Sequence, residues 1–181
     1  REIKNAQGQI VQPGITVSFN TAVDFFKYGA FAQVNRKLLN DRLNLSAGLR
    51  TDMNSFTTDG NNPFQTLSPR LSASYQLSDK WRLNASVGRY FKTPIYTVLG
   101  YRQDGNFVNK SNKYIRSDHL VAGLEFIPTP TTRITLEGFS KKYDNYPISV
   151  RDGISLANQG GNFGAIGNET VTDRKSTRLN S

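Results

Sequence analysis

Apolar and polar residues alternate along much of this chain, with the period of two that is typical of β-strands. In PRLSASYQLSDKWRLNASVGRY, at residues 69–90, a break at SDK separates two alternating runs. One face of this pair is apolar and holds Leu71, Ala73, Tyr75, Leu77, Trp81, Leu83, Ala85 and Val87. The other face is polar and holds Arg70, Ser72, Gln76, Arg82, Asn84 and Ser86. The pattern predicts a β-hairpin, whose apolar face could meet either a protein core or lipid.

Four further segments alternate in the same way, which gives six predicted strands. Their apolar rows are Tyr28, Ala30, Ala32 and Val34, then Leu43, Leu45, Ala47 and Leu49, then Leu120, Ala122, Leu124 and Phe126, and finally Ile134 and Leu136. The opposite rows of the predicted strands include the charged residues Arg50, Arg70, Arg82, Glu125 and Glu137. These five could not share a dry interior without extensive pairing, but they can line a water-filled lumen or contact a polar plug.

The connections between the predicted strands alternate between short and long. Residues 40–41, 78–80 and 128–132 form short turns, whereas residues 52–67, 92–117 and 141–162 form long segments rich in Asn, Asp, Gly and Pro. Asp59-Gly60 and Asp104-Gly105 suit tight turns within the long segments. An outer-membrane barrel sorts its connections in this way, because its strand order sends short turns to the periplasmic side and long loops to the outside.

The aromatic residues fit the same orientation. Trp81 and Phe126 fall near the short-turn ends of their strands, whereas Tyr28, Phe91 and Tyr143 fall near the long-loop ends. We therefore predict two aromatic girdles at the two membrane interfaces, with Leu, Ala and Val between them.

The composition is consistent with a barrel whose apolar face meets lipid. Of the 181 residues 36% are hydrophobic, which is low for a soluble core, and 20% are charged, which is low for a disordered chain. No stretch approaches 18 consecutive apolar residues, which excludes a transmembrane helix, but a transmembrane strand needs only about 10 residues with alternate positions apolar. The lack of cysteine excludes disulfide frameworks and thiol catalysis.

The net charge of +9 raises the question of an anionic partner. The basic residues are scattered, without a basic helix, zinc-finger spacing or RNP-like motif, so we do not expect nucleic acid binding. Lipopolysaccharide phosphates or an anionic ligand would equally favour a basic surface.

No motif predicts catalysis, a metal site or a bound cofactor. His119 has no second histidine or acidic residue at metal-ligand spacing. The glycines of GGNFGAIG, at residues 160–167, lack the Lys-Ser/Thr of a phosphate-binding loop. We therefore expect this chain not to be an enzyme.

Binding is instead expected in the long loops. Aromatic rings stack on sugars or chelator rings, while Arg and Asn supply directional hydrogen bonds. The candidate ligand-binding residues are Tyr96, Tyr101, Arg102, Asp104, Asn106, Tyr143, Asn145 and Tyr146.

The last nine residues, DRKSTRLNS, differ from the rest of the chain in having three basic residues and no apolar periodicity. This string resembles the translated read-through of a common sequencing adapter. We therefore predict a partial barrel over residues 1–172 and a non-native tail over residues 173–181, with an ordinary polar terminus as the alternative.

Several stretches together resemble the barrel of TonB-dependent outer-membrane receptors, most closely the Bacteroidetes type. They are YGAFAQVNRKLLNDRLNLSAGLR, LSPRLSASYQLSDKWRLNASVGRYFKTP, DHLVAGLEF, TRITLEGFSKKYDNYP and GNFGAIGNE, which span residues 28–169 in the order of the family. The resemblance implies an all-β, antiparallel up-and-down transmembrane barrel of about 22 strands around an N-terminal plug. It also implies import of a scarce small-molecule or oligosaccharide ligand, such as an iron chelate, cobalamin or a glycan, with energy transmitted by TonB.

The chain shows neither a recognisable plug nor a TonB-contacting segment, so we read it as a piece of such a barrel. We expect an open, curved sheet of about 6–8 strands, located in the outer membrane of a Gram-negative bacterium in contact with lipid and lipopolysaccharide. Two alternatives are a passive porin-like barrel and a soluble glycan-binding β-sandwich. The presence of a plug domain upstream in the gene would distinguish the TonB-dependent importer from the porin-like barrel. Membrane fractionation would distinguish it from the soluble β-sandwich.

Overall fold

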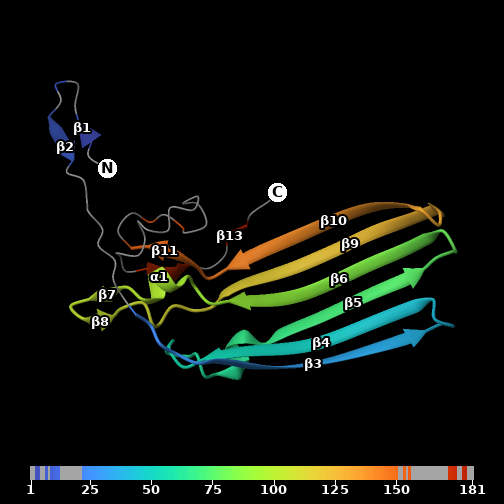
Figure 1. Ribbon diagram of the computed structural model, residues 1–181, viewed down its shortest axis with the longest axis horizontal. Helices are drawn as coiled ribbons and strands as arrows, with labels where there is room; N and C mark the ends of the chain where they lie inside the picture. The colour runs from blue at the N-terminus through green and yellow to red at the C-terminus, as the bar shows by residue number, and fades with distance from the viewer. Residues whose placement is uncertain are drawn as a thin grey trace.

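Six long strands form one antiparallel sheet in the computed structural model (Figure 1). The structure describes residues 3–4, 7, 9–12, 22–150, 153, 155, 171–174 and 177–178. The long strands are β3 (Lys27–Leu38), β4 (Leu43–Asn54), β5 (Ser68–Gln76), β6 (Trp81–Lys92), β9 (Ile115–Thr129) and β10 (Thr132–Asp144). All six predicted strands are confirmed, and each is longer than its apolar row.

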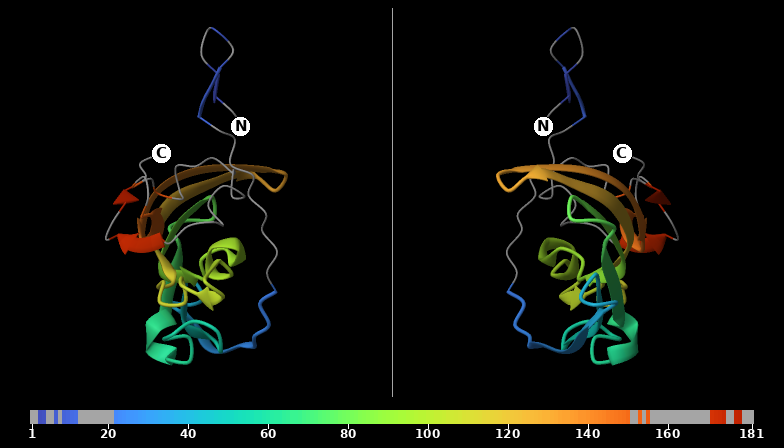
Figure 2. Two further views of the ribbon diagram at one scale, coloured as in Figure 1. Left: turned by 90° about the vertical axis from the view of Figure 1, so that its left-hand side faces the viewer. Right: turned by 90° about the vertical axis from the view of Figure 1, so that its right-hand side faces the viewer.

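Each long strand pairs with the next one along the chain, which is the up-and-down topology. The sheet order runs from β3 at one edge to β10, which also pairs with the short strand β13 (Thr177–Arg178). The end-on views in Figure 2 show the sheet as an arc and not as a closed cylinder. The predicted open, curved, all-β sheet is therefore confirmed.

The strand register gives the sheet an apolar face and a polar face. Leu71 lies opposite Val87 and Ala73 opposite Ala85, so the apolar rows of neighbouring strands coincide. Large apolar side chains on this face are exposed: Leu49, Leu71, Leu83, Val87, Leu120, Ile134 and Leu136. Exposure of so many large side chains on one face is unfavourable in water, so this face needs an apolar partner.

The polar face is the concave one, because Lys27 of this face donates a hydrogen bond to Tyr96 of α1 (Tyr96–Leu99), a segment that lies within the arc in Figure 2. Open hollows lie along the same face. One hollow of about 230 Å³ is lined mainly by the small polar side chains of β4, β5 and β6, with Gly123 and Glu137 at its border. A second, of about 160 Å³, includes Phe31, Arg50 and Arg70. All five predicted charged residues (Arg50, Arg70, Arg82, Glu125 and Glu137) lie on this face by register.

The three short connections lie together at one end of the sheet, at the right of Figure 1. In the first of them Leu39, Asn40 and Asp41 all have positive φ, a conformation that Asn and Asp tolerate better than most residues. The third is shorter than predicted: β9 continues through Pro128 to Thr129, so only residues 130–131 form the turn. The predicted sorting of short and long connections is confirmed.

The long connections lie at the opposite end of the sheet and contain short helices and strands. These are η1 (Pro63–Thr66), α1 (Tyr96–Leu99), β7 (Arg102–Gln103), β8 (Asn106–Phe107), β11 (Tyr146–Ser149) and β12 (Val171–Arg174). Asp104 and Gly105 have φ values of 50° and 81°, which confirms the tight turn between β7 and β8. Near the N-terminus β1 (Ile3–Lys4) pairs with β2 (Ile10–Gln12).

No helix in the described part of the chain is both long enough and apolar enough to cross a membrane.

The predicted tail overlaps the last two strands. In β12, Asp173 lies opposite Pro147 and Arg174 opposite Tyr146, and β13 lies wholly within residues 173–181. Residues 175–176 and 179–181 lie outside the described part. The foreign origin of residues 173–181 stays a prediction.

The aromatic girdles are supported at one end and corrected at the other. Trp81 and Phe126 lie opposite each other on the apolar face with stacked rings, whose centroids are 4.3 Å apart. Tyr28 and Phe91 also lie on the apolar face by register. Tyr143 lies opposite Ser117 on the polar face, so its assignment to a lipid-facing girdle is wrong.

Candidate ligand-binding surface

A row of aromatic rings with an arginine at one end crosses the polar face near the long-loop end. It consists of Arg70, Tyr90, His119, Tyr143 and Tyr146, which come from five different strands, and we call it the aromatic row. The Arg70 guanidinium lies over the Tyr90 ring at 4.6 Å, and the ring centroids then follow at 4.7, 6.5 and 5.8 Å. The row offers several ring surfaces and one guanidinium to the concave side.

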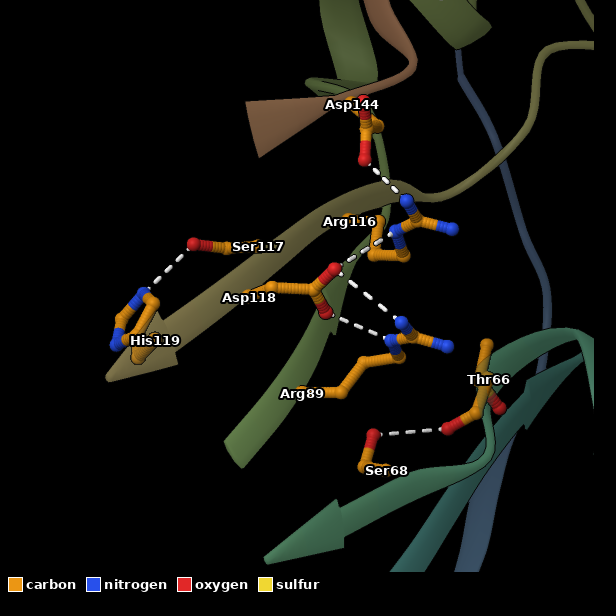
Figure 3. Close-up of polar contacts among 8 residues, drawn as sticks. All are labelled: Thr66, Ser68, Arg89, Arg116, Ser117, Asp118, His119 and Asp144. Atoms are coloured by element: carbon orange, nitrogen blue, oxygen red, sulfur yellow. Dashed lines mark hydrogen bonds and ion pairs between the residues drawn. The ribbon is translucent and has the colours of Figure 1, made fainter. Parts of the chain in front are cut away.

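Two local features hold the row in place. A Cβ on Gly88 would come within 3.0 Å of the Tyr90 ring, so glycine leaves the space in which this ring lies over β6. The ring of His119 shares a 2.6 Å hydrogen bond with the Ser117 hydroxyl, two residues back on the same strand (Figure 3). Both contacts restrict the rings before any ligand arrives.

Charge is distributed unevenly along the polar face. From Arg70 to the loop end of the long strands, the basic residues are Lys27, Arg50, Arg70, Lys92 and Lys141. The single acidic residue there is Asp52, which makes a bidentate pair with Arg50 at 2.7 Å. Toward the short turns, Lys37, Arg82 and Arg133 share the face with Glu125 and Glu137. The described part of the polar face is therefore basic at the loop end and nearly balanced at the turn end.

At the turn end Glu125 is the centre of an ion-pair group. Its Oε2 lies 2.6 Å from Arg133 Nη2 and its Oε1 lies 3.4 Å from Arg82 Nη1. The Glu125 side chain is 3% exposed, whereas those of Arg82 and Arg133 are 42% and 65% exposed. The arginines can therefore lose this partner and stay hydrated, but the carboxylate cannot.

This asymmetry predicts unequal effects of removing the two sides. The double variant Arg82→Gln, Arg133→Gln should lower the free energy of unfolding by at least about 1 kcal/mol more than Glu125→Gln, because it leaves a buried carboxylate unpaired. Urea unfolding of the intact receptor in detergent would measure both. Equal losses would contradict the burial argument.

A second group of rings and cations joins the long connections to one another. Phe56, from the β4–β5 connection, lies 5.6 Å from Phe25 and 5.1 Å from Phe107 between ring centroids. Tyr96 of α1 lies 5.7 Å from Phe25, and its hydroxyl accepts a hydrogen bond from Lys27. Segments that are far apart in sequence therefore pack together, and the α1 segment lies within the arc of the sheet in Figure 2.

Asn54, at the end of β4, is the polar centre of the same region. It is 1% exposed, and its Oδ1 accepts hydrogen bonds from the backbone N–H groups of Phe56 and Thr57 at 2.9 and 2.8 Å. Its Nδ2 donates to the hydroxyl of Tyr114, which begins the approach to β9, at 2.5 Å. Burial raises the pKa of Tyr114. Asn54 thus fixes one connection to the other.

The structure separates the predicted ligand-binding residues into three places. Tyr143, Asn145 and Tyr146 lie at the end of the aromatic row, where the Asn145 amide donates to the Tyr114 carbonyl at 3.3 Å. Tyr96 belongs to the packed rings near Phe25. Tyr101 follows α1, and the β7–β8 hairpin holds Arg102, Asp104 and Asn106.

Sequence reasoning did not connect Tyr90 and His119 with Tyr143, and it did not assign a role to Phe25, Phe56 or Phe107. The alternation pattern could have placed Tyr90 and His119 on the polar face, but their contact depends on the strand register. In the part that the structure describes, no group of three or more His, Cys, Asp and Glu residues could hold a metal ion.

An ion-pair chain continues the apolar face beyond Val87 and Leu120, toward the long-loop end. Asp118 lies 2.7 Å from Arg89 Nε and 3.5 Å from Arg116 Nε, and Arg116 also pairs with Asp144 (Figure 3). Arg89 follows Val87 on this face, and Asp118 precedes Leu120. Charged pairs here indicate that the apolar band ends below this level and that the strands continue into water.

Comparison with known families supplies a match over nearly the whole chain. A family model described as "TonB dependent receptor-like, beta-barrel" matches residues 3–176, which include all six long strands. No curated protein matches the chain.

Proposed function

This chain belongs to the TonB-dependent receptor-like β-barrel family, and from that premise we propose that its sheet is part of the wall of an active importer. In this proposal the apolar face meets outer-membrane lipid, the polar face lines the lumen, and the long loops take up a scarce ligand outside the cell. TonB then supplies the energy for import.

Membership in this family gives the general role of the chain but does not identify its ligand. The family is one of transport and receptor barrels in the outer membrane of Gram-negative bacteria, and it is not an enzyme family. It implies a plug domain, TonB and a transported ligand as partners. The particular ligand, the coupling to TonB and the contact with lipopolysaccharide are proposals for this chain.

The proposal rests on two differences observed together. The sheet has one apolar and one polar face, and it has short turns at one end and long connections at the other. The apolar face exposes a continuous set of large side chains, and a lipid bilayer covers such a face without a second protein layer. Short turns gather at one end and long, mutually packed connections at the other. Both edges of the six-stranded arc are available to further strands, because among the described residues β3 ends the sheet and β10 bears only the two-residue β13.

The aromatic row and the loop residues are the proposed route of the ligand. Tyr143, Asn145 and Tyr146 would meet it at the lumen side, and Arg102, Asp104 and Asn106 at the β7–β8 hairpin. Arg50, Arg70, Arg82, Glu125 and Glu137 would face the lumen or the plug.

Uptake with and without the proton gradient tests this proposal. Cells with and without the intact receptor gene should be compared for accumulation of labelled iron chelates, cobalamin and oligosaccharides. We expect deletion to abolish high-affinity uptake of one class, and an uncoupler to abolish it equally in the parent strain. Receptor-dependent uptake that persists after the gradient has collapsed would indicate a passive porin-like barrel instead.

A further inference from the structure

We infer that the loop end of the polar face binds a ligand that carries an anionic group beside a sugar or aromatic ring. The inference rests on the proposed import function and specifies the chemistry of its ligand. It places the ring of the ligand against the aromatic row and its anionic group beside Arg70, with Lys141 as a second cation three strands away along the row. Neither side chain makes an ion pair with a carboxylate among the described residues.

The charges point to an anion. The acidic residue on the loop half of the described polar face, Asp52, is already paired with Arg50. Lys141 lies directly opposite His119 in the register, and Lys92 follows Tyr90 by two residues on the same face. An excess of one sign on a concave surface attracts the opposite sign and raises its local concentration.

The geometry points to a ring. Tyr90 lies between the Arg70 guanidinium, at 4.6 Å from its centroid, and the His119 ring, at 4.7 Å. The row continues through Tyr143 to Tyr146, so it is long enough to offer more than one stacking position. Arg70 also lines the neighbouring hollow of about 160 Å³, together with Arg50 and Phe31. A guanidinium at the junction of a stacking surface and a hollow favours a carboxylate or phenolate attached to a ring.

Acidic saccharides and catecholate iron chelates share this chemistry, and matched probes distinguish them. One pair is trigalacturonic acid and its neutral methyl ester, and the other is iron(III) tris-catecholate and a neutral iron(III) trihydroxamate. Binding to the purified intact receptor would be measured at low and high salt. We expect the anionic member of one pair to bind at least about tenfold more tightly than its neutral partner, and this preference to shrink at high salt.

Two variants and one control variant test whether the ligand binds at this position. Arg70→Gln should weaken binding of the preferred anionic probe at least about tenfold, because a charge-assisted hydrogen bond is lost. Arg133→Gln is the matched control, since Arg133 is an exposed arginine at the turn end of the same face, and it should leave binding unchanged. Tyr90→Ala should weaken both members of the saccharide pair alike, because their rings are the same, or the tris-catecholate alone, because the trihydroxamate has no ring to stack.

Three binding results would overturn the inference. They are equal affinities within both pairs, equal effects of Arg70→Gln and Arg133→Gln, and failure of both anionic probes to bind, since the basic side chains would then be matched by the plug or the opposite wall. Gradient-driven uptake of a neutral ligand would refute the inference and leave the import function intact. Gradient-independent uptake would refute the import function, whatever the affinities of the probes.

Discussion

Replacing Ala85 by arginine should destabilise the intact barrel by about 2–4 kcal/mol, the cost of an arginine at the middle of the lipid-facing surface. Ala85 lies in the middle of β6, opposite Ala73 on one side and Ala122 on the other, all on the apolar face. Alanine contributes little apolar area, so the loss measures the charge and not the removal of a large side chain. Urea titration of the receptor folded into lipid vesicles would give the free energy of unfolding.

Ser86→Arg is the matched control. Ser86 is the next residue on the same strand, is similarly small, and lies on the polar face, where it lines the larger hollow. An arginine there can remain hydrated, so we expect a loss below about 1 kcal/mol. Equal losses for the two variants would mean that the apolar face does not meet lipid.

Replacing Asn54 by alanine should release the β4–β5 connection from the β6–β9 connection. The change removes the acceptor of the Phe56 and Thr57 amides and the donor to Tyr114. Each buried group that is left unpaired costs about 1–3 kcal/mol, so hydrogen exchange at these two amides should accelerate by at least about tenfold. Exchange measured by mass spectrometry on the intact receptor would detect this locally.

Asn61→Ala is the control for this effect. Asn61 lies in the same connection, and its Oδ1 accepts one exposed hydrogen bond from the Tyr28 hydroxyl at 2.7 Å. We expect unchanged exchange at Phe56 and Thr57 in this variant. If Asn54→Ala also left the exchange unchanged, the connections would be held by their aromatic contacts alone. If the exchange does accelerate, uptake in the Asn54→Ala strain shows whether ordered loops are needed for import.

The strands and turns were predictable because a single rule governs them. Alternate side chains of a strand point to opposite faces, so the rows around Leu71, Leu83 and Leu120 indicate both the strand and its exposed face. The ends of the strands were less predictable. β6 and β9 continue past Val87 and Leu120 into charged residues, where ion pairs such as that of Arg89 and Asp118 replace apolar contacts. Alternation of apolar residues cannot detect that continuation.

The candidate site was only partly predictable, because its parts come from different strands. Tyr143 and Tyr146 were identified as aromatic residues near a long loop, but their neighbours Tyr90 and His119 depend on strand register. Tyr143 was also assigned to the lipid-facing girdle, because the apolar row of β10 ends at Leu136 and no longer marks the faces so far along the strand. The contacts of Phe56 with Phe25 and Phe107 join three separate segments, and no local pattern encodes them.

The most direct test of the central claim is a cysteine scan along β6 from residue 81 to residue 87. This chain contains no cysteine, so single replacements in a cysteine-free intact receptor report one position at a time. A water-soluble maleimide should label the even positions, which line the polar face, and should leave the odd positions unlabelled in intact outer membranes. The odd positions should react only after the receptor has been unfolded, because a maleimide attacks the thiolate, which does not form in lipid. Labelling without a period of two, or labelling of the odd positions in place of the even ones, would contradict a barrel wall with lipid on its apolar face and a lumen on its polar face.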